Sequence, residues 1–153
     1  MAINDDELKP LEHSSQNNCF GCGAANETGL QLRFSVAPDG TIVSLINLGA
    51  RFTGPPGFIH GGILATLMDE AMSKTLRARG VTAMTRNMEV DYLRPAPIET
   101  PLRIEAKHLR EEGRKHWCEA VLLDSKGRTL TSGKGLFIAL DPELVAAHLA
   151  RSK

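Results

Sequence analysis

One segment of the chain is long and regular enough to form a helix of several turns, and it limits what the rest can build around it. Residues 61–79 contain no proline and no glycine beyond the first two positions, and Gly80 follows them. On a helical wheel the apolar residues of this segment cover about half of the circumference. So broad an apolar face predicts a helix in the core of the protein. The residues on this face are Ile63, Leu64, Leu67, Met68, Ala71 and Met72.

The remainder of the chain is rich in strand patterns. Residues 30–36 alternate between apolar and polar, Pro38-Asp39-Gly40 supplies a turn, and residues 41–48 are again typical of a strand, which predicts a hairpin. Four further strands are predicted after the helix, at residues 84–93, 102–111, 115–123 and 128–140. Two strands, one long helix and four strands indicate the α+β class, with a mostly antiparallel sheet of about six strands.

The length of 153 residues suits one domain. We expect a poorly ordered arm or edge segment at residues 1–18, the folded domain at 19–140, and a short helix or tail at 141–153. One helix leaves part of such a sheet and its edges uncovered, so we expect a homodimer. Whether two dimers join into a tetramer stays open.

Composition excludes several classes of function. Lys and Arg together number 18, as do Asp and Glu, so the formal net charge is zero and no overall field attracts nucleic acid. No run approaches the roughly 20 apolar residues that span a membrane, and the first ten residues lack the apolar segment of a secretory signal. Three cysteines, an odd number, argue against a disulfide framework. We therefore expect a cytoplasmic protein that binds neither nucleic acid nor membrane.

The entrance of the helix, His60-Gly61-Gly62, is the first candidate for chemistry. The first N–H groups of a helix have no partner within it, and the helix dipole is positive there, so this end favours an anion or a developing oxyanion. The alternative is that the two glycines only relieve crowding between helix and sheet.

Two acids follow within the helix, Asp69 at the edge of the apolar face and Glu70 on the side expected to face solvent. A partly desolvated carboxylate is more basic, and can take a proton from water or attack a carbonyl. Asp69 lies about 12 Å along the helix axis from Gly61, too far for both groups to act on one carbonyl within one chain. Antiparallel helices of two protomers would bring them together. The alternative is an ordinary acid at the boundary of the core.

The segment from His60 to Ala71 resembles the helix entrance of hotdog-fold acyl-CoA thioesterases of the PaaI-like, phenylacetic-acid-degradation type, in which His-Gly-Gly is followed after six residues by Asp. Three other segments agree with this resemblance, which covers about residues 19–140. They are Cys19-Phe20-Gly21-Cys22-Gly23 with Asn26 and Gly29-Leu30, Met88-Glu89-Val90-Asp91-Tyr92-Leu93-Arg94-Pro95, and Gly133-Lys134-Gly135-Leu136-Phe137. The resemblance implies a hotdog fold, in which the sheet wraps around the central helix.

The resemblance also implies an enzyme that hydrolyses acyl-CoA thioesters to a free acid and CoA, with no cofactor or metal beyond the substrate. In this family the Gly61 amide would polarise the thioester carbonyl, His60 would shape the turn, and Asp69 of the partner subunit would be nucleophile or general base. Thr85, sixteen residues after Asp69, would position water. The leaving thiol has a pKa of about 8–9, so a strong general acid is dispensable.

Further residues are candidates for substrate binding. Gly62 belongs to the same helix entrance, and Asn87, two residues beyond Thr85 on an extended strand, is expected to share its face. Arg86 and Arg94, with Arg51, are candidates for the phosphates of CoA. Many family members carry Asn or Gln six residues before the histidine, where this chain has Gly54. Activity level and acyl preference therefore stay open, as do two alternatives to hydrolysis: a noncatalytic acyl-CoA-binding module acting as sensor or effector, and a hotdog hydratase.

Three other groups of residues receive plainer interpretations. Cys19-x-x-Cys22 would need two more ligands for zinc, from Cys118 or a distant histidine (His13, His108 or His116), so a reduced, packed turn is favoured. His108 and His116 are expected to face each other across a hairpin as a surface pair. Trp117 is expected in the core or an interface.

Overall fold

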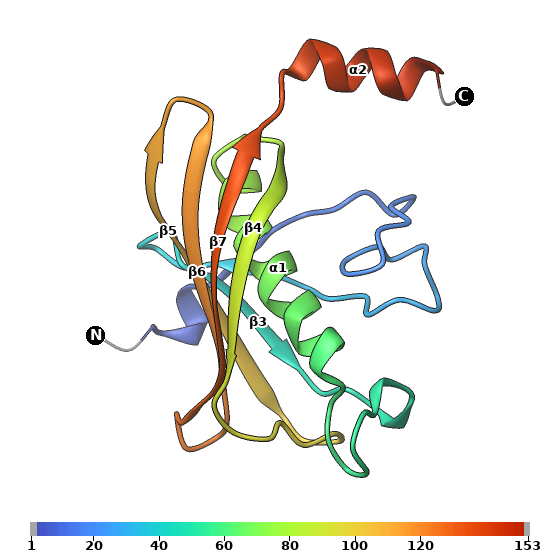
Figure 1. Cartoon of the computed structure of the whole chain (residues 1–153), viewed down its shortest axis with the longest axis vertical. Coiled ribbons are helices and arrows are strands. Elements are labelled where there is room, and N and C mark those ends of the chain that lie inside the picture. The colour runs from blue at the N-terminus through green and yellow to red at the C-terminus, as the bar shows by residue number, and fades with distance from the viewer. Residues whose placement is uncertain (1–2, 152–153) are drawn as a thin grey trace.

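The computed structural model describes residues 3–151, and in this range one antiparallel sheet curves around one long helix, with a second helix near the C-terminus (Figure 1). The seven strands lie in the order β1-β2-β3-β5-β6-β7-β4. The α+β class and the central helix are confirmed. The elements are η1 (Asp5–Glu7), β1 (Lys9–Pro10), β2 (Ser35–Val36), β3 (Ile42–Ile46), η2 (Ala50–Phe52), α1 (Gly61–Arg77), β4 (Ala83–Tyr92), β5 (Leu102–Glu112), β6 (Lys115–Leu123), β7 (Thr129–Ala139) and α2 (Pro142–Arg151).

The four strands after the helix lie where they are predicted, but the first hairpin is shorter. Only Ser35 and Val36 of the predicted first strand pair with β3. Leu30 and Leu32 are buried, yet their N–H groups donate to carbonyls of the loop at residues 20–21. Alternation of apolar residues reports which side chains are buried. It does not report which backbone groups pair, and so it overstates the length of this strand.

The seventh strand comes from the N-terminal segment. Residues 5–7 form a single 3-10 turn, and Lys9–Pro10 pairs with β2 at the edge of the sheet. Residues 1–2 of the expected arm lie outside the described residues. The domain boundaries near residues 18 and 140 stay predictions.

Helix α1 packs against the concave face of the sheet and forms the centre of the core. All of its predicted apolar face is buried except Ile63, which is half-buried. Glycines of β7 allow the close approach, because a Cβ on Gly133 would lie 2.9 Å from the Cβ of Met68. A side chain at this position would therefore push the helix off the sheet.

Helix α2 extends from the end of β7 away from the body of the molecule (Figure 1), and none of its residues is buried. It fits the expected short C-terminal helix. No helix within residues 3–151 combines the length and the apolar character that a membrane span requires.

Candidate functional site

The N-terminus of α1 is built by the loop that precedes it. His60 is the N-cap, and its Nδ1 accepts a hydrogen bond of 2.9 Å from the Gly62 N–H. This capping bond satisfies one of the first amides of the helix. Gly61, the first helical residue, has no acceptor one turn earlier in the helix for its own N–H. The Tyr92 hydroxyl donates to the carbonyl of Gly61 at 3.0 Å and so fixes this end of the helix to β4.

The middle of the helix carries the carboxylate. Asp69 is half-buried, and its Oδ1 accepts a hydrogen bond from the hydroxyl of Thr85 on β4, with 2.5 Å between the oxygens. Burial raises the pKa of Asp69, while the bond from Thr85 opposes that rise. The charge of Glu70 raises the pKa further, and Lys74 lowers it. The predicted pair of Asp69 and Thr85 is thus brought together, with the carboxylate made more basic than an exposed one.

The predicted partnership of Asn87 with Thr85 is wrong, because β4 is bulged between them. Thr85 pairs with Phe137 and Asn87 pairs with Leu136, so Arg86 is the extra residue. A bulge reverses the alternation of side chains beyond it. Thr85 therefore faces the helix, whereas Asn87 lies on the outer face of the sheet beside Trp117 and Leu136.

The remaining candidates are more dispersed. Gly62 is exposed at the helix entrance. Arg94 donates to the carbonyl of Thr129, and Arg51 donates to the carbonyls of residues 27 and 29, so both arginines hold loops in place. Arg86 is exposed at the bulge.

Gly54 occupies a position where the backbone leaves no space for a side chain. A Cβ there would lie 2.7 Å from the Cα of His60. The loop closes on itself through a bond from the Gly54 N–H to the Phe58 carbonyl. The polar side chain that many family members carry at this position is thus excluded by the close approach of the N-cap residue.

Two side chains that the sequence placed at the surface are buried. The Glu70 side chain is only 12% exposed and pairs with Lys74 at 2.8 Å, because the N-terminal loop covers this side of the helix. His116 is also buried, although it does face His108, with 3.0 Å between Nε2 of His108 and Nδ1 of His116. Trp117 is half-buried, and the Arg110 guanidinium stacks on its ring at 3.5 Å.

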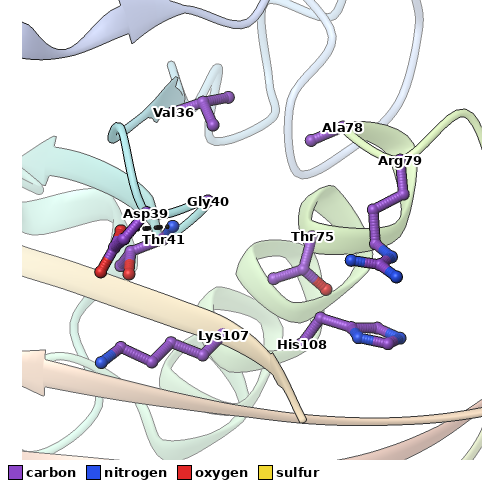
Figure 2. Close-up of a pocket in the computed structure, with 9 residues that line it drawn as sticks. All are labelled: Val36, Asp39, Gly40, Thr41, Thr75, Ala78, Arg79, Lys107 and His108. Atoms are coloured by element: carbon purple, nitrogen blue, oxygen red, sulfur yellow. Dashed lines mark hydrogen bonds between the residues drawn. The ribbon is translucent and has the colours of Figure 1, made fainter. Parts of the chain in front are cut away.

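A cavity of about 390 Å³ lies at the other end of α1, between its last turn, the turn after β2 and strand β5 (Figure 2). Figure 2 shows Asp39 and Lys107 on one side of it and Arg79 and His108 on the other. None of the residues that line it belongs to the helix entrance or to the Asp69 pair. No sequence signal points to this cavity, since its walls come from three segments that are distant from one another in the chain.

Known proteins resemble this chain in both sequence and fold. The sequence profile of the thioesterase superfamily matches residues 56–131. The acyl-coenzyme A thioesterase THEM4 of Rattus norvegicus is 34% identical over 143 residues, which cover 91% of this chain and 61% of the relative. THEM4 of Mus musculus is 36% identical over 102 residues, which cover 66% of this chain and 44% of the relative. The chain thus spans less than two thirds of the length of these curated relatives.

Solved structures place the chain among hotdog proteins. A crystal structure described as a thioesterase superfamily protein has a TM-score of 0.74 and 27% identity, covering 81% of this chain and 60% of that one. The BH2602 protein of Bacillus halodurans, solved with CoA, has a TM-score of 0.65 and 27% identity, covering 73% and 76%. PaaI of E. coli shares the fold, with a TM-score of 0.67 and 19% identity. The match covers 73% of this chain and 81% of PaaI. The chain belongs to the thioesterase superfamily and has the hotdog fold.

Proposed function

We propose that the protein hydrolyses acyl-CoA thioesters to a free acid and CoA, in a site that two protomers share. The observation that carries this proposal is the half-buried Asp69 carboxylate of α1, which accepts a hydrogen bond from Thr85 of β4. The N-terminus of the same helix presents the Gly61 amide. The relatives named acyl-coenzyme A thioesterase and the neighbour solved with CoA support the substrate class.

The proposed reaction uses few groups. The Gly61 N–H of one protomer donates to the thioester oxygen and stabilises the oxyanion that forms there. Asp69 of the other protomer takes a proton from water, the resulting hydroxide attacks the carbonyl carbon, and the C–S bond breaks to release the CoA thiolate. The Thr85 hydroxyl donates a hydrogen bond to Asp69 and keeps lone pairs that can accept a hydrogen bond from the attacking water. This arrangement favours Asp69 as general base over Asp69 as nucleophile.

The test is thiol release from a panel of aliphatic and aromatic acyl-CoAs. Replacing the base removes the proton acceptor, so Asp69→Asn should lower kcat by about 10² or more while leaving the fold intact. Glu143→Gln changes an exposed carboxylate on α2 and serves as the matched control.

Wild-type rates in the Asp69→Asn variant would contradict the assignment. Tight calorimetric binding of acyl-CoA without turnover by the wild-type protein would contradict hydrolysis and favour a noncatalytic sensor or effector module instead.

A further inference from the structure

The buried pair of Glu70 and Lys74 on α1 contacts the loop that contains both cysteines of the Cys19-x-x-Cys22 motif. The two side chains are 12% and 9% exposed and lie 2.8 Å apart. Gly21 allows Glu70 to sit under the loop, since a Cβ there would lie 2.5 Å from Oε2 of Glu70. The loop and the helix are thus joined through polar groups away from water.

The loop presents both sulfurs to this carboxylate. The Gly23 N–H donates to the Cys19 carbonyl at 2.8 Å, which closes a tight turn between the two cysteines. The two Sγ atoms and a Glu70 oxygen all lie within 4.8 Å of one another, and Sγ of Cys19 is 3.6 Å from Oε1 of Glu70. Tetrahedral zinc, with bonds of about 2.3 Å to sulfur and 2.0–2.2 Å to oxygen, separates such ligand atoms by about 3.5 Å.

A second observation comes from His13. Both of its ring nitrogens are shielded from solvent, and neither has a hydrogen-bond partner in the described chain. The preceding residue is held against the last turn of α1, where Arg77 donates to the carbonyl of Glu12. Burial lowers the pKa of His13, the nearby positive charges of Lys74 and Arg77 lower it further, and the charge of Glu70 opposes them. Leaving an imidazole without partners costs free energy, and coordination would satisfy one of its nitrogens.

The charges of the cluster balance around a divalent cation. Two thiolates and one carboxylate carry three negative charges, which a divalent metal and the Lys74 ammonium together neutralise. Lys74 is placed for this role, with Nζ 3.2 Å from Sγ of Cys22, and Asn17 also donates to that sulfur. Without a metal, burial and the proximity of Glu70 raise the pKa of Cys22 to about 11. A metal must therefore displace a proton to bind.

We propose that Cys19, Cys22 and Glu70 form a site for zinc or another borderline-soft divalent metal, with the unpartnered imidazole of His13 as the candidate fourth ligand. The site ties the N-terminal loop to the helix that carries Asp69. It is independent of the proposed hydrolysis. The motif supplies two ligands, and the third comes from Glu70, which is distant in sequence and lies beside the cysteines only in the fold.

Cobalt(II) is the probe, because it binds zinc sites and reports thiolate ligands through a charge-transfer band in the near ultraviolet. The chain of 153 residues, treated with a chelator and kept reduced, is titrated with Co²⁺. We expect the thiolate band to saturate at one equivalent in the wild type and in Cys118→Ser, the control. Cys118 is also a buried thiol, but its contact is with Thr75.

Cys22→Ser should lose most of the band, and His13→Gln should bind the metal at least about ten-fold more weakly. Absence of a thiolate band in the wild type at one equivalent, or an unchanged band in Cys22→Ser, would overturn the site. Unchanged affinity in His13→Gln would overturn the place of His13 in it. The wild-type spectrum decides the main question even if a variant fails to fold.

Discussion

At the scale of single residues, two opposed effects act on the pKa of Asp69. Burial favours its neutral form, and the hydrogen bond from Thr85 favours its charged form. The residue types and their spacing, together with the family resemblance, were enough to predict this pair. They were not enough for Asn87, because a bulge leaves no mark in residue spacing, nor for Glu70, because the loop that buries it is about fifty residues away in sequence.

Removing the Thr85 hydroxyl should shift the pH dependence of hydrolysis. In Thr85→Val burial acts unopposed, so the pKa of Asp69 rises further above its ordinary value. Since the base must be ionised, the acid limb of kcat/KM should move to higher pH, with a lower plateau. Thr85→Ser keeps the hydroxyl and should retain the wild-type limb. An identical limb in the valine variant would show that Asp69 is not the titrating base.

The Gly61 amide can be removed without breaking the helix. Proline is well tolerated at the first helical position, and His60 already has the extended backbone that a residue before proline requires. Gly61→Pro should lower kcat by about 10²–10³, as expected for loss of an oxyanion donor. Gly61→Ala keeps the N–H, and its Cβ would make an ordinary contact with Tyr92 at 3.7 Å, so it should stay close to wild type. Equal rates for the two variants would exclude this amide from the reaction.

At the scale of elements, the fit between α1 and β7 sets the position of the site. The helix and the long strands were predictable, because each has many residues with one period. The strands β1 and β2 were not predictable in the same way, because each has only two residues and two residues are too few to show a period. The closeness of helix and sheet depends on Gly133 and Gly135 of β7, which lie against Met68 and Met72. The periodicity of the strand does not reveal this contact.

Filling the contact between α1 and β7 should destabilise the fold. In Gly133→Ala the new Cβ would lie 2.9 Å from that of Met68, so helix and sheet must separate, at a cost of about 1–3 kcal/mol in the free energy of unfolding. Gly49→Ala, which meets no atom within 4 Å, is the control. Urea denaturation followed by circular dichroism measures both. Equal midpoints for the two variants would contradict this account of the packing.

At the scale of the whole molecule, one protomer does not complete the proposed site. Gly61 and Asp69 lie on the same helix, more than two turns apart. Strand β4, which carries Thr85, is the last strand of the sheet, and it leaves one side without a strand partner among the described residues. Tyr92 and Met84 on this strand are 55% and 62% exposed. A second copy of the chain is the natural partner for such an edge, so we propose a homodimer as the active form.

Mixing two inactive variants tests this claim most directly. Asp69→Asn and Gly61→Pro are prepared separately, unfolded and refolded together, and assayed for thiol release. If Gly61 of one protomer works with Asp69 of the other, each mixed dimer holds one intact site and one doubly altered site. Random assortment should then restore about a quarter of wild-type activity per protomer. If both groups act within one chain, or if either is dispensable, the mixture will show only the average of the two variants, and the shared site is refuted.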